Sequence, residues 1–360
     1  MGWQLTSMET NKGIVAAIFS AALFGISTPL AKVLLIDISP LALAGLLYFG
    51  SGIGLLVWRR LRQRTGTAIE YREAPLARAD WGWMAGAILA GGIVAPVLLM
   101  LGLERISGAA AALLLNFEGV FTALLAWFVF HENVDRRVAT GFFLIVVAGI
   151  LLSWQGAPAG GLPLGALAVM AACLGWAVDN NLTQRVSGSD PVQVAGIKGL
   201  VAGCINLGLA AGTGWEPAPV PVMLAAIGVG FLGYGVSLSL FVWALRYLGT
   251  ARTGAYFSVA PFFGAAMALV ILSERPGSLF WVAAVMMAIG VYLHLTERHE
   301  HLHRHERLVH SHAHRHDEHH QHRHDEAYDG AEPHTHTHEH TPLVHSHPHY
   351  PDLHHRHLHG

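Results

Sequence analysis

Three ionisable residues interrupt long apolar stretches of this sequence. Glu118 stands between two apolar runs, Asp179 lies near the end of a later stretch, and Lys198 lies near the start of the next one. If these stretches cross a membrane, each charge at the bilayer centre costs about 2.5–3.5 kcal/mol on insertion scales. Charged residues kept at that cost mark substrate or ion paths, so all three are candidates for function.

Glu118 lies about 12 residues into its stretch, which in a helix is a depth of about 18 Å and close to the bilayer midplane. Its own stretch contains no cation to pair with it. We expect it to bind a proton or a substrate amine; the alternative is a hydrogen bond to a neighbouring helix that serves packing. Asn116 is the other polar candidate here, although a spacing of two residues puts it on a different side of the helix.

Asp179 and Lys198 stand on two successive stretches joined by a short loop. Consecutive membrane helices run antiparallel, which brings these residues to a similar depth and predicts a buried ion pair. Asn180 adds an amide beside it, and Tyr234 and Tyr256 are further candidates for the same path. A proton, or a substrate with both a carboxylate and an amine, could exchange with the pair; a purely structural pair is the alternative.

Histidines dominate the end of the chain, because 23 of the 25 lie between residues 299 and 359. Neutral imidazole is a ligand for Zn²⁺, Ni²⁺, Co²⁺ and Cu²⁺, so we expect this segment to bind transition metals, although no cofactor is required. With almost no apolar residues, residues 296–360 are expected to be disordered. The metal candidates are the alternating histidines His299, His301, His303, His305, His310, His312, His314, His316, His334, His336, His338 and His340.

Two alternative interpretations of the histidine tail stay open. With its histidines neutral it carries a net charge of −5, and protonating half of them makes it positive near pH 6.5. That change of sign would draw it to anionic lipid, which makes it a pH-dependent membrane contact. It could also have no role.

The composition is that of a membrane protein. Hydrophobic residues make up 53% and charged residues 13% of the 360 positions, whereas a soluble domain is about 25% charged. Apolar runs long enough to cross a bilayer as helices occur ten times. The predicted spans are 13–35, 41–58, 81–103, 106–130, 138–154, 163–182, 192–213, 221–245, 250–272 and 278–295.

Basic residues in the short loops predict the orientation in the bilayer. If the N-terminus is cytoplasmic, twelve Lys and Arg residues before the tail lie inside and three lie outside. Positive loops face the cytoplasm, so both termini are expected there.

Several other classes of protein are disfavoured. No Lys/Arg stripe suited to nucleic acid occurs outside one loop. A phosphate-binding G-x-x-x-x-G-K-[ST] loop and the H-E-x-x-H zinc motif are both missing from the sequence, which disfavours an ATP-driven pump and a metalloenzyme. Cys173 and Cys204 form no disulfide framework.

The sequence also repeats itself weakly. An offset of 142 residues places Glu132 on Glu274, and an offset of 151 places Pro40 on Pro191. Each half then has five spans, and an odd number forces the second half to enter the membrane upside down. Inverted repeats are typical of secondary transporters, whose substrate sites lie between the halves near the midplane.

From about Gly13 to Leu295 the chain resembles the EamA type of the drug/metabolite transporter superfamily. The residues that carry the resemblance are Phe24-Gly25, Trp176-Ala177, the run 113–126 closing with His131-Glu132, and 260–263 closing with Ser273-Glu274. One departure is Gly119, because the family often has proline after the Glu of the fourth span. Pro261 keeps that proline in the second half.

The resemblance implies an all-α protein of ten transmembrane helices in two inverted five-helix repeats. The expected organisation is a short N-terminus 1–12, a first repeat 13–154, a linker 155–162, a second repeat 163–295 and the histidine tail 296–360. It also implies an inner-membrane carrier of small organic metabolites, often an exporter, driven by a gradient and not an enzyme.

Two alternatives to this hypothesis stay open. One is a carrier of a transition metal or of a metal–metabolite complex, and the other is a membrane metal sensor that transports nothing. The expected partners are a small-molecule substrate, the lipid bilayer and transition metal ions, with no nucleic acid. A homodimer is one arrangement that the sequence allows.

Overall fold

The structure of the protein is a computed structural model. It describes residues 2–64, 76, 78–130, 136–155, 163–186, 189–241, 244, 253, 256–295, 300–304, 308–314, 334–340 and 344–348. Side chains are described for most of 13–293 within these ranges and for none of the tail.

The body of the molecule, up to residue 295, is helical. Its first half contains α1 (Gly2–Leu34), α2 (Pro40–Arg64), η1 (Arg78–Asp80), α3 (Trp81–Ala87), η2 (Ile88–Val94), α4 (Ala95–Arg105), α5 (Gly108–Leu114), α6 (Phe117–Phe130) and α7 (Arg136–Gln155). Its second half contains α8 (Leu164–Arg185), α9 (Pro191–Gly212), α10 (Val220–Gly230), η3 (Phe231–Val236), α12 (Ala260–Ile271) and α13 (Ser278–Leu295).

Five stretches in the described part of the chain are long and apolar enough to cross a membrane, and they are 13–34, 40–61, 81–105, 192–212 and 220–241. Four shorter apolar helices accompany them, at 108–122, 139–153, 260–271 and 278–293. α8 is 22 residues long but has the polar run Asp179-Asn180-Asn181 in its last two turns, before it ends at Arg185. The protein is therefore a multi-pass membrane protein, and several of the predicted spans are shorter or less regular than the sequence suggests.

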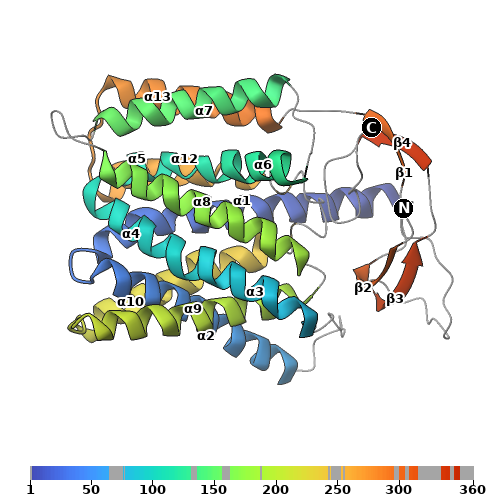
Figure 1. Ribbon diagram of the computed structural model, residues 1–360, viewed down its shortest axis with the longest axis horizontal. Coiled ribbons are helices and arrows are strands. Elements are labelled where there is room, and N and C mark those ends of the chain that lie inside the picture. Colours follow the sequence, from blue (N-terminus) through green and yellow to red (C-terminus); the bar gives the residue numbers. More distant parts are fainter. Residues whose placement is uncertain are drawn as a thin grey trace.

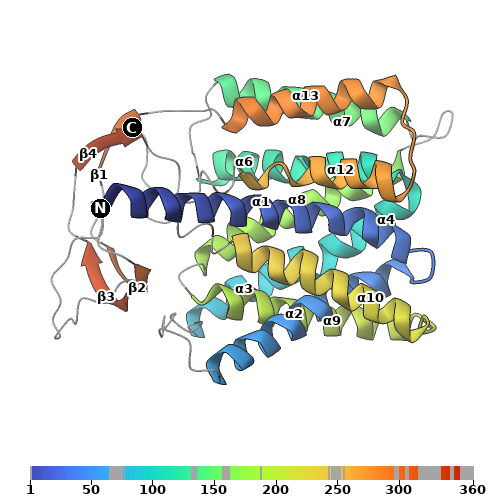
Figure 2. The same ribbon diagram turned by 180° about the vertical axis from the view of Figure 1, so that it is seen from behind.

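The helices pack mainly across the two halves of the chain. α2 packs on α9, α7 on α13, α1 on α12, and α8 on both α4 and α6. In Figures 1 and 2, α7 and α13 form one edge of the bundle and α2, α9 and α10 form the other, with α1, α5, α6, α8 and α12 between them. Because each half packs on the other, the centre of the bundle is lined by both.

Close helix contacts rely on small residues. A Cβ at Gly52 of α2 would overlap the Leu200 nitrogen of α9, and one at Gly203 would overlap the Phe49 nitrogen. No side chain fits at either glycine, so the backbones of the two helices can contact each other directly. Small residues have this role at many contacts between membrane helices.

Two π-helical segments interrupt the spans 81–105 and 220–241. In η2, Ala95 N–H bonds to the Ala90 carbonyl, five residues back, which frees the Gly91 carbonyl. Pro96 has no N–H, so the Gly92 carbonyl also loses its helical partner. π-segments of this kind occur often at functional sites because their free carbonyls need other donors.

The composition of the tail predicts disorder, but its described parts form four short strands, so the prediction is wrong for these residues. β1 (Glu300–Arg304) pairs antiparallel with β4 (Val344–Pro348), and β2 (Leu308–His314) pairs antiparallel with β3 (His334–His340). Histidine at every second position has the period of a β-strand, a pattern that composition alone does not register. The strands lie beyond the end of the bundle where α1 begins (Figure 1).

Candidate functional site

The predicted span 106–130 is a broken helix, and the break positions Glu118. α5 ends at Leu114 and α6 begins at Phe117, with a turn between them. Two backbone hydrogen bonds of the i to i−3 type stabilise the turn. Asn116 N donates to the Leu113 carbonyl (3.1 Å), and Glu118 N donates to the Leu115 carbonyl (3.0 Å). Glu118 therefore stands in the first turn of α6, where the helix dipole favours a carboxylate.

Glu118 reaches across to α8. Asn180 Nδ2 donates a hydrogen bond of 2.8 Å to Glu118 Oε1. Asn180 is exposed and Glu118 is half-buried. A small group can therefore approach the Glu118 carboxylate more easily than the nearly inaccessible carboxylate of Asp179.

The predicted ion pair between Asp179 and Lys198 is present and links α8 to α9. Lys198 Nζ donates to Asp179 Oδ2, and Thr183 Oγ1 donates to Asp179 Oδ1 at 2.9 Å. Asp179 is only 3% exposed, so both carboxylate oxygens are satisfied away from solvent. The next residue on α8, Asn180, bonds Glu118, so one turn of α8 makes both contacts; we call Glu118, Asp179, Asn180 and Lys198 the polar cluster.

Gly91 of η2 is the backbone against which Asp179 packs. A Cβ at Gly91 would overlap Asp179 Oδ2, so only glycine leaves room for the carboxylate. The Gly91 carbonyl, freed by the π-segment, accepts hydrogen bonds from Tyr48 Oη (2.6 Å) and Trp176 Nε1 (3.0 Å). The π-segment therefore fixes both the polar cluster and two aromatic side chains.

We predict that Gly91→Ala lowers the free energy of unfolding by about 1–3 kcal/mol, because the added methyl group overlaps the Asp179 carboxylate. Gly208→Ala is the control, since a Cβ there meets nothing within 4 Å and alanine favours a helix. Thermal unfolding of both variants in detergent measures the effect. Equal unfolding temperatures for Gly91→Ala and the wild type would contradict the close packing of Gly91 on Asp179.

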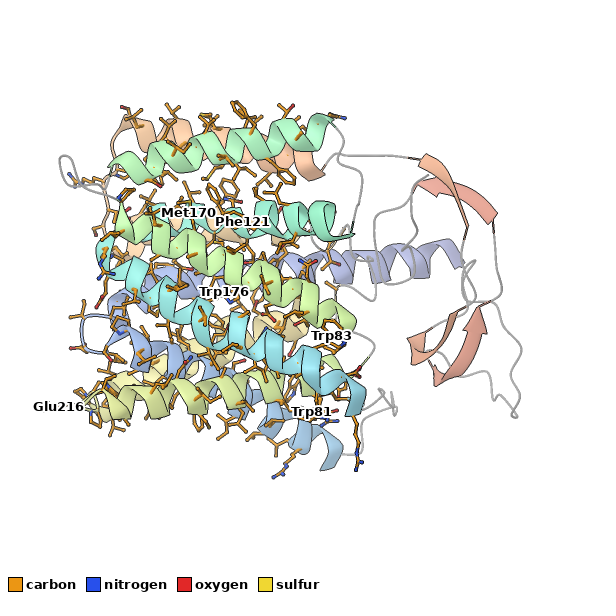
Figure 3. The ribbon with its side chains drawn as sticks, viewed as in Figure 1. Trp81, Trp83, Phe121, Met170, Trp176 and Glu216 are labelled. Carbon is orange, nitrogen blue, oxygen red and sulfur yellow. The ribbon has the colours of Figure 1, made fainter. Side chains whose placement is uncertain are left out.

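Aromatic rings from both halves adjoin the polar cluster. Phe24 of α1 lies 6.5 Å from Trp176 of α8 and 5.8 Å from Tyr234 of η3, measured between ring centroids. Tyr48 of α2 lies 5.5 Å from Tyr234, and Phe257 lies 5.6 Å from Phe24. We call these five residues the aromatic cluster; Figure 3 shows its Trp176 in the middle of the bundle.

Not every predicted site residue belongs to these clusters. The Asn116 side chain donates to the Leu113 carbonyl, which also accepts the Asn116 backbone N–H, and it contacts Met287 of α13 rather than the polar cluster. Tyr256 packs with Ala16 and Ala17 of α1 in a separate apolar cluster. Tyr234 does join the aromatic cluster.

Tyr48 and Thr183 were not predicted as site residues from the sequence, and Trp176 was singled out only for the family resemblance. Trp176, Asp179 and Thr183 are spaced three and four residues apart, which places them on one face of α8. Because Asp179 was already a candidate, this spacing could have identified Trp176 and Thr183 as its neighbours. Tyr48 had none, because its role depends on the carbonyl freed in η2.

A second contact between the halves lies at the end of α12. Glu274 accepts hydrogen bonds from the backbone nitrogens of Gly108 (2.6 Å) and Ala109 (2.9 Å), which caps α5. Ser273, one residue earlier, has a left-handed backbone with φ of 52°. Lys32 donates to the Leu103 and Ile106 carbonyls close by. Glu132, which the repeat places on Glu274, lies outside the described residues.

No group of three or more His, Cys, Asp or Glu that could hold a metal occurs among the side chains that the structure describes. The predicted metal ligands His299, His305 and His316 lie outside the described residues, and the others lie on the strands of the tail, where no side chain is described.

Known proteins resemble the chain along most of its length. An uncharacterized transporter of Methanothermobacter thermautotrophicus is 29% identical over 293 residues, which is 78% of this chain and 85% of that protein. An uncharacterized transporter of Synechocystis sp. is 23% identical and covers 80% and 90% of the two chains. A segment of 78 residues, 22% of this chain, is 41% identical to 65% of a protein of Pseudomonas paraeruginosa named as a probable 4-amino-4-deoxy-L-arabinose-phosphoundecaprenol flippase subunit.

A crystal structure of another protein shares the fold, with a TM-score of 0.54, 19% identity, and coverage of 80% of this chain and 97% of that one. The EamA-like transporter family matches the chain twice, over residues 11–154 and 163–296. The protein therefore belongs to the EamA-like transporter family of the drug/metabolite transporter superfamily.

Proposed function

We propose that this transporter is a gradient-driven carrier of a small organic metabolite that bears an amine, with Glu118 as the group that binds the amine or a proton. The observation that carries the proposal is that α8, inside a membrane-spanning body, contacts Glu118 of α6 through Asn180 and Lys198 of α9 through the adjacent Asp179. Charged groups in such a place are expensive, so a functional role accounts for them.

The two parts of the polar cluster suit different tasks. Both oxygens of Asp179 already have partners and Asp179 is 3% exposed, whereas Glu118 is half-buried and Asn180 is its side-chain partner among the described residues. An arriving amine or proton would therefore meet Glu118 first. If the substrate also has a carboxylate, that carboxylate would pair with Lys198 in place of Asp179.

The aromatic cluster supports an amine-bearing substrate. Phe24, Tyr48, Trp176, Tyr234 and Phe257 come from both halves and contact one another. Two of them, Tyr48 and Trp176, bond the carbonyl of Gly91, against which Asp179 packs. Aromatic faces attract cations and pack against apolar parts of a solute. A metabolite with an amine and an apolar portion matches this combination.

An inverted repeat is part of the proposal, and three observations support it. The offset of 142 residues carries η2 (Ile88–Val94) onto η3 (Phe231–Val236), so both halves have a π-segment at the same place. The same offset carries the turn at 115–116 onto 257–258, next to the turn at 258–259 that precedes α12. Helix pairs also match, since α1 packs on α12 as α8 packs on α6.

The orientation proposed is an inner-membrane protein with both termini in the cytoplasm. Figure 3 places Trp81 and Trp83 toward the end of the bundle near the tail and Glu216 at the opposite end. A thiol probe that cannot cross membranes should label Glu216→Cys in intact cells, in a background without Cys173 and Cys204. Protection of that cysteine, with labelling of Gly360→Cys instead, would reverse the orientation.

The proposed function is tested by comparing the metabolites that cells release with and without the protein. The amine-bearing compounds that differ are then offered to proteoliposomes under a proton gradient. Uptake that requires both the protein and the gradient is the expected result. Accumulation of a free metal ion, with no organic compound transported, would favour the metal-carrier alternative, and no transport of either would favour the sensor.

The resemblance to a flippase subunit favours a second candidate function, the movement of an amphiphilic lipid that bears an amine. The same polar and aromatic clusters would then bind the headgroup. Protein-dependent movement of a labelled aminolipid between leaflets, without uptake of soluble amines, would support this candidate over the first.

A further inference from the structure

The four strands of the tail form one nested stem. β1 pairs with β4 on the outside and β2 pairs with β3 on the inside, both antiparallel. Residues 305–307 separate β1 from β2, and residues 341–343 separate β3 from β4, so the two paired segments are spaced by three residues on each side. Figure 2 shows both pairs beside the first turns of α1.

The register of the strands places histidine opposite histidine. In the outer pair, His301 is opposite His347 and His303 is opposite His345. In the inner pair, the opposed positions are His310 and His338, His312 and His336, and His314 and His334. Of the histidines on these strands, only His340 faces another residue type, Leu308. Each of the others is opposed by a histidine, although the two partners come from segments about 20 to 45 residues apart in the sequence.

These positions also share a face within each pair. Residues two apart lie on the same side of a strand, so the four histidines of the outer pair occupy one face and the six opposed histidines of the inner pair occupy one face. The opposite face of the inner pair has Val309, Ser311, Ala313, Thr335, Thr337 and Glu339. Opposed residues have Cβ atoms about 4.5–5.5 Å apart, which is a distance that two ligands of one metal ion can span.

We propose that the strand register of the tail builds metal sites, one on β1 and β4 and at least one on β2 and β3, for a divalent metal of the Zn²⁺, Ni²⁺, Co²⁺ or Cu²⁺ class. Two adjacent opposed pairs supply four imidazoles, which is the number of ligands in a tetrahedral zinc site. Nitrogen ligands alone, with no carboxylate on the face, suit these metals and not Mg²⁺ or Ca²⁺. The proposal does not depend on the substrate of the carrier.

Metal binding would also account for the strands themselves. A two-stranded pair without further packing is marginally stable at best in water. A metal held between the strands stabilises the pairing by its binding free energy, because the unpaired chain has no preformed site. Folding of the tail and metal binding are then one linked reaction.

The test moves histidines without changing the composition. The slipped variant exchanges neighbours along β2, so that its three histidines lie on the opposite face; it consists of Val309→His, His310→Val, Ser311→His, His312→Ser, Ala313→His and His314→Ala. The compensated variant keeps all the changes of the slipped variant and adds the matching exchange in β3. The added changes are His334→Thr, Thr335→His, His336→Thr, Thr337→His, His338→Glu and Glu339→His. In that variant histidines again oppose each other at the positions paired in the register.

Zn²⁺ is titrated by calorimetry into full-length wild type and both variants in detergent at pH 7.5, with helical content by circular dichroism to check the body. We expect the slipped variant to bind Zn²⁺ at the inner pair at least about tenfold more weakly, because opposed ligands are lost. The compensated variant should recover the wild-type affinity for Zn²⁺ at the inner pair. Zn²⁺ binding at the outer pair should be retained in all three proteins. Equal affinity and stoichiometry in wild type and slipped variant would overturn the proposal, as would failure of the compensated variant to recover.

Discussion

Glu118→Gln is expected to lower proton-linked transport at least about tenfold while the protein still folds, because the amide neither takes up a proton nor pairs with an amine. The fold should survive since Gln keeps an Oε1 that accepts the hydrogen bond from Asn180 Nδ2. Uptake into proteoliposomes at several values of the external pH measures both the rate and its pH dependence.

Glu216→Gln is the matched control, because Glu216 is an exposed glutamate on the loop between α9 and α10. It should transport as the wild type does. If Glu118→Gln retained the wild-type rate and pH dependence, Glu118 would be a structural residue and the proposed amine or proton site would be wrong.

Lys198→Met is expected to destabilise the protein by about 3–5 kcal/mol, because it leaves the Asp179 carboxylate buried without a cation. Thr183 would remain as a side-chain donor to that carboxylate. The double variant Asp179→Asn/Lys198→Met removes both charges and should recover most of the lost stability, since replacing a buried pair by neutral residues is often neutral or stabilising. Thermal unfolding in detergent measures both effects.

Transport by the double variant then separates a structural pair from a functional one. If substrate groups exchange with the pair, the double variant folds but transports little. If the double variant transports at the wild-type rate, the pair only joins α8 to α9. Reversing the two charges is a poorer test, because Gly91 leaves no room for a lysine at position 179.

The sequence was sufficient for features that depend on local patterns. Apolar runs and boundary residues indicated where helices begin and end, for example Pro40 at the start of α2 and Ser278 at the start of α13. The Asp179–Lys198 pair was also predictable, because two neighbouring antiparallel helices bring equal depths together. The resemblance to the EamA type rested on motifs that remain visible in the sequence, and the family comparison confirms it.

Only the tertiary structure showed which helix faces meet. The π-segment in η2 exposes the Gly91 carbonyl, but its donors Tyr48 and Trp176 come from α2 and α8, far away in the sequence. The sequence placed Asn116 on a different side of its helix from Glu118 but made it a candidate for the same path, and only the structure shows that it contacts Met287 of α13. The pairing of histidines in the tail likewise depends on register. Periodicity is a property of neighbouring residues, while carbonyl partners, helix breaks and strand register are decided by contacts between distant segments, which no local pattern in one sequence specifies.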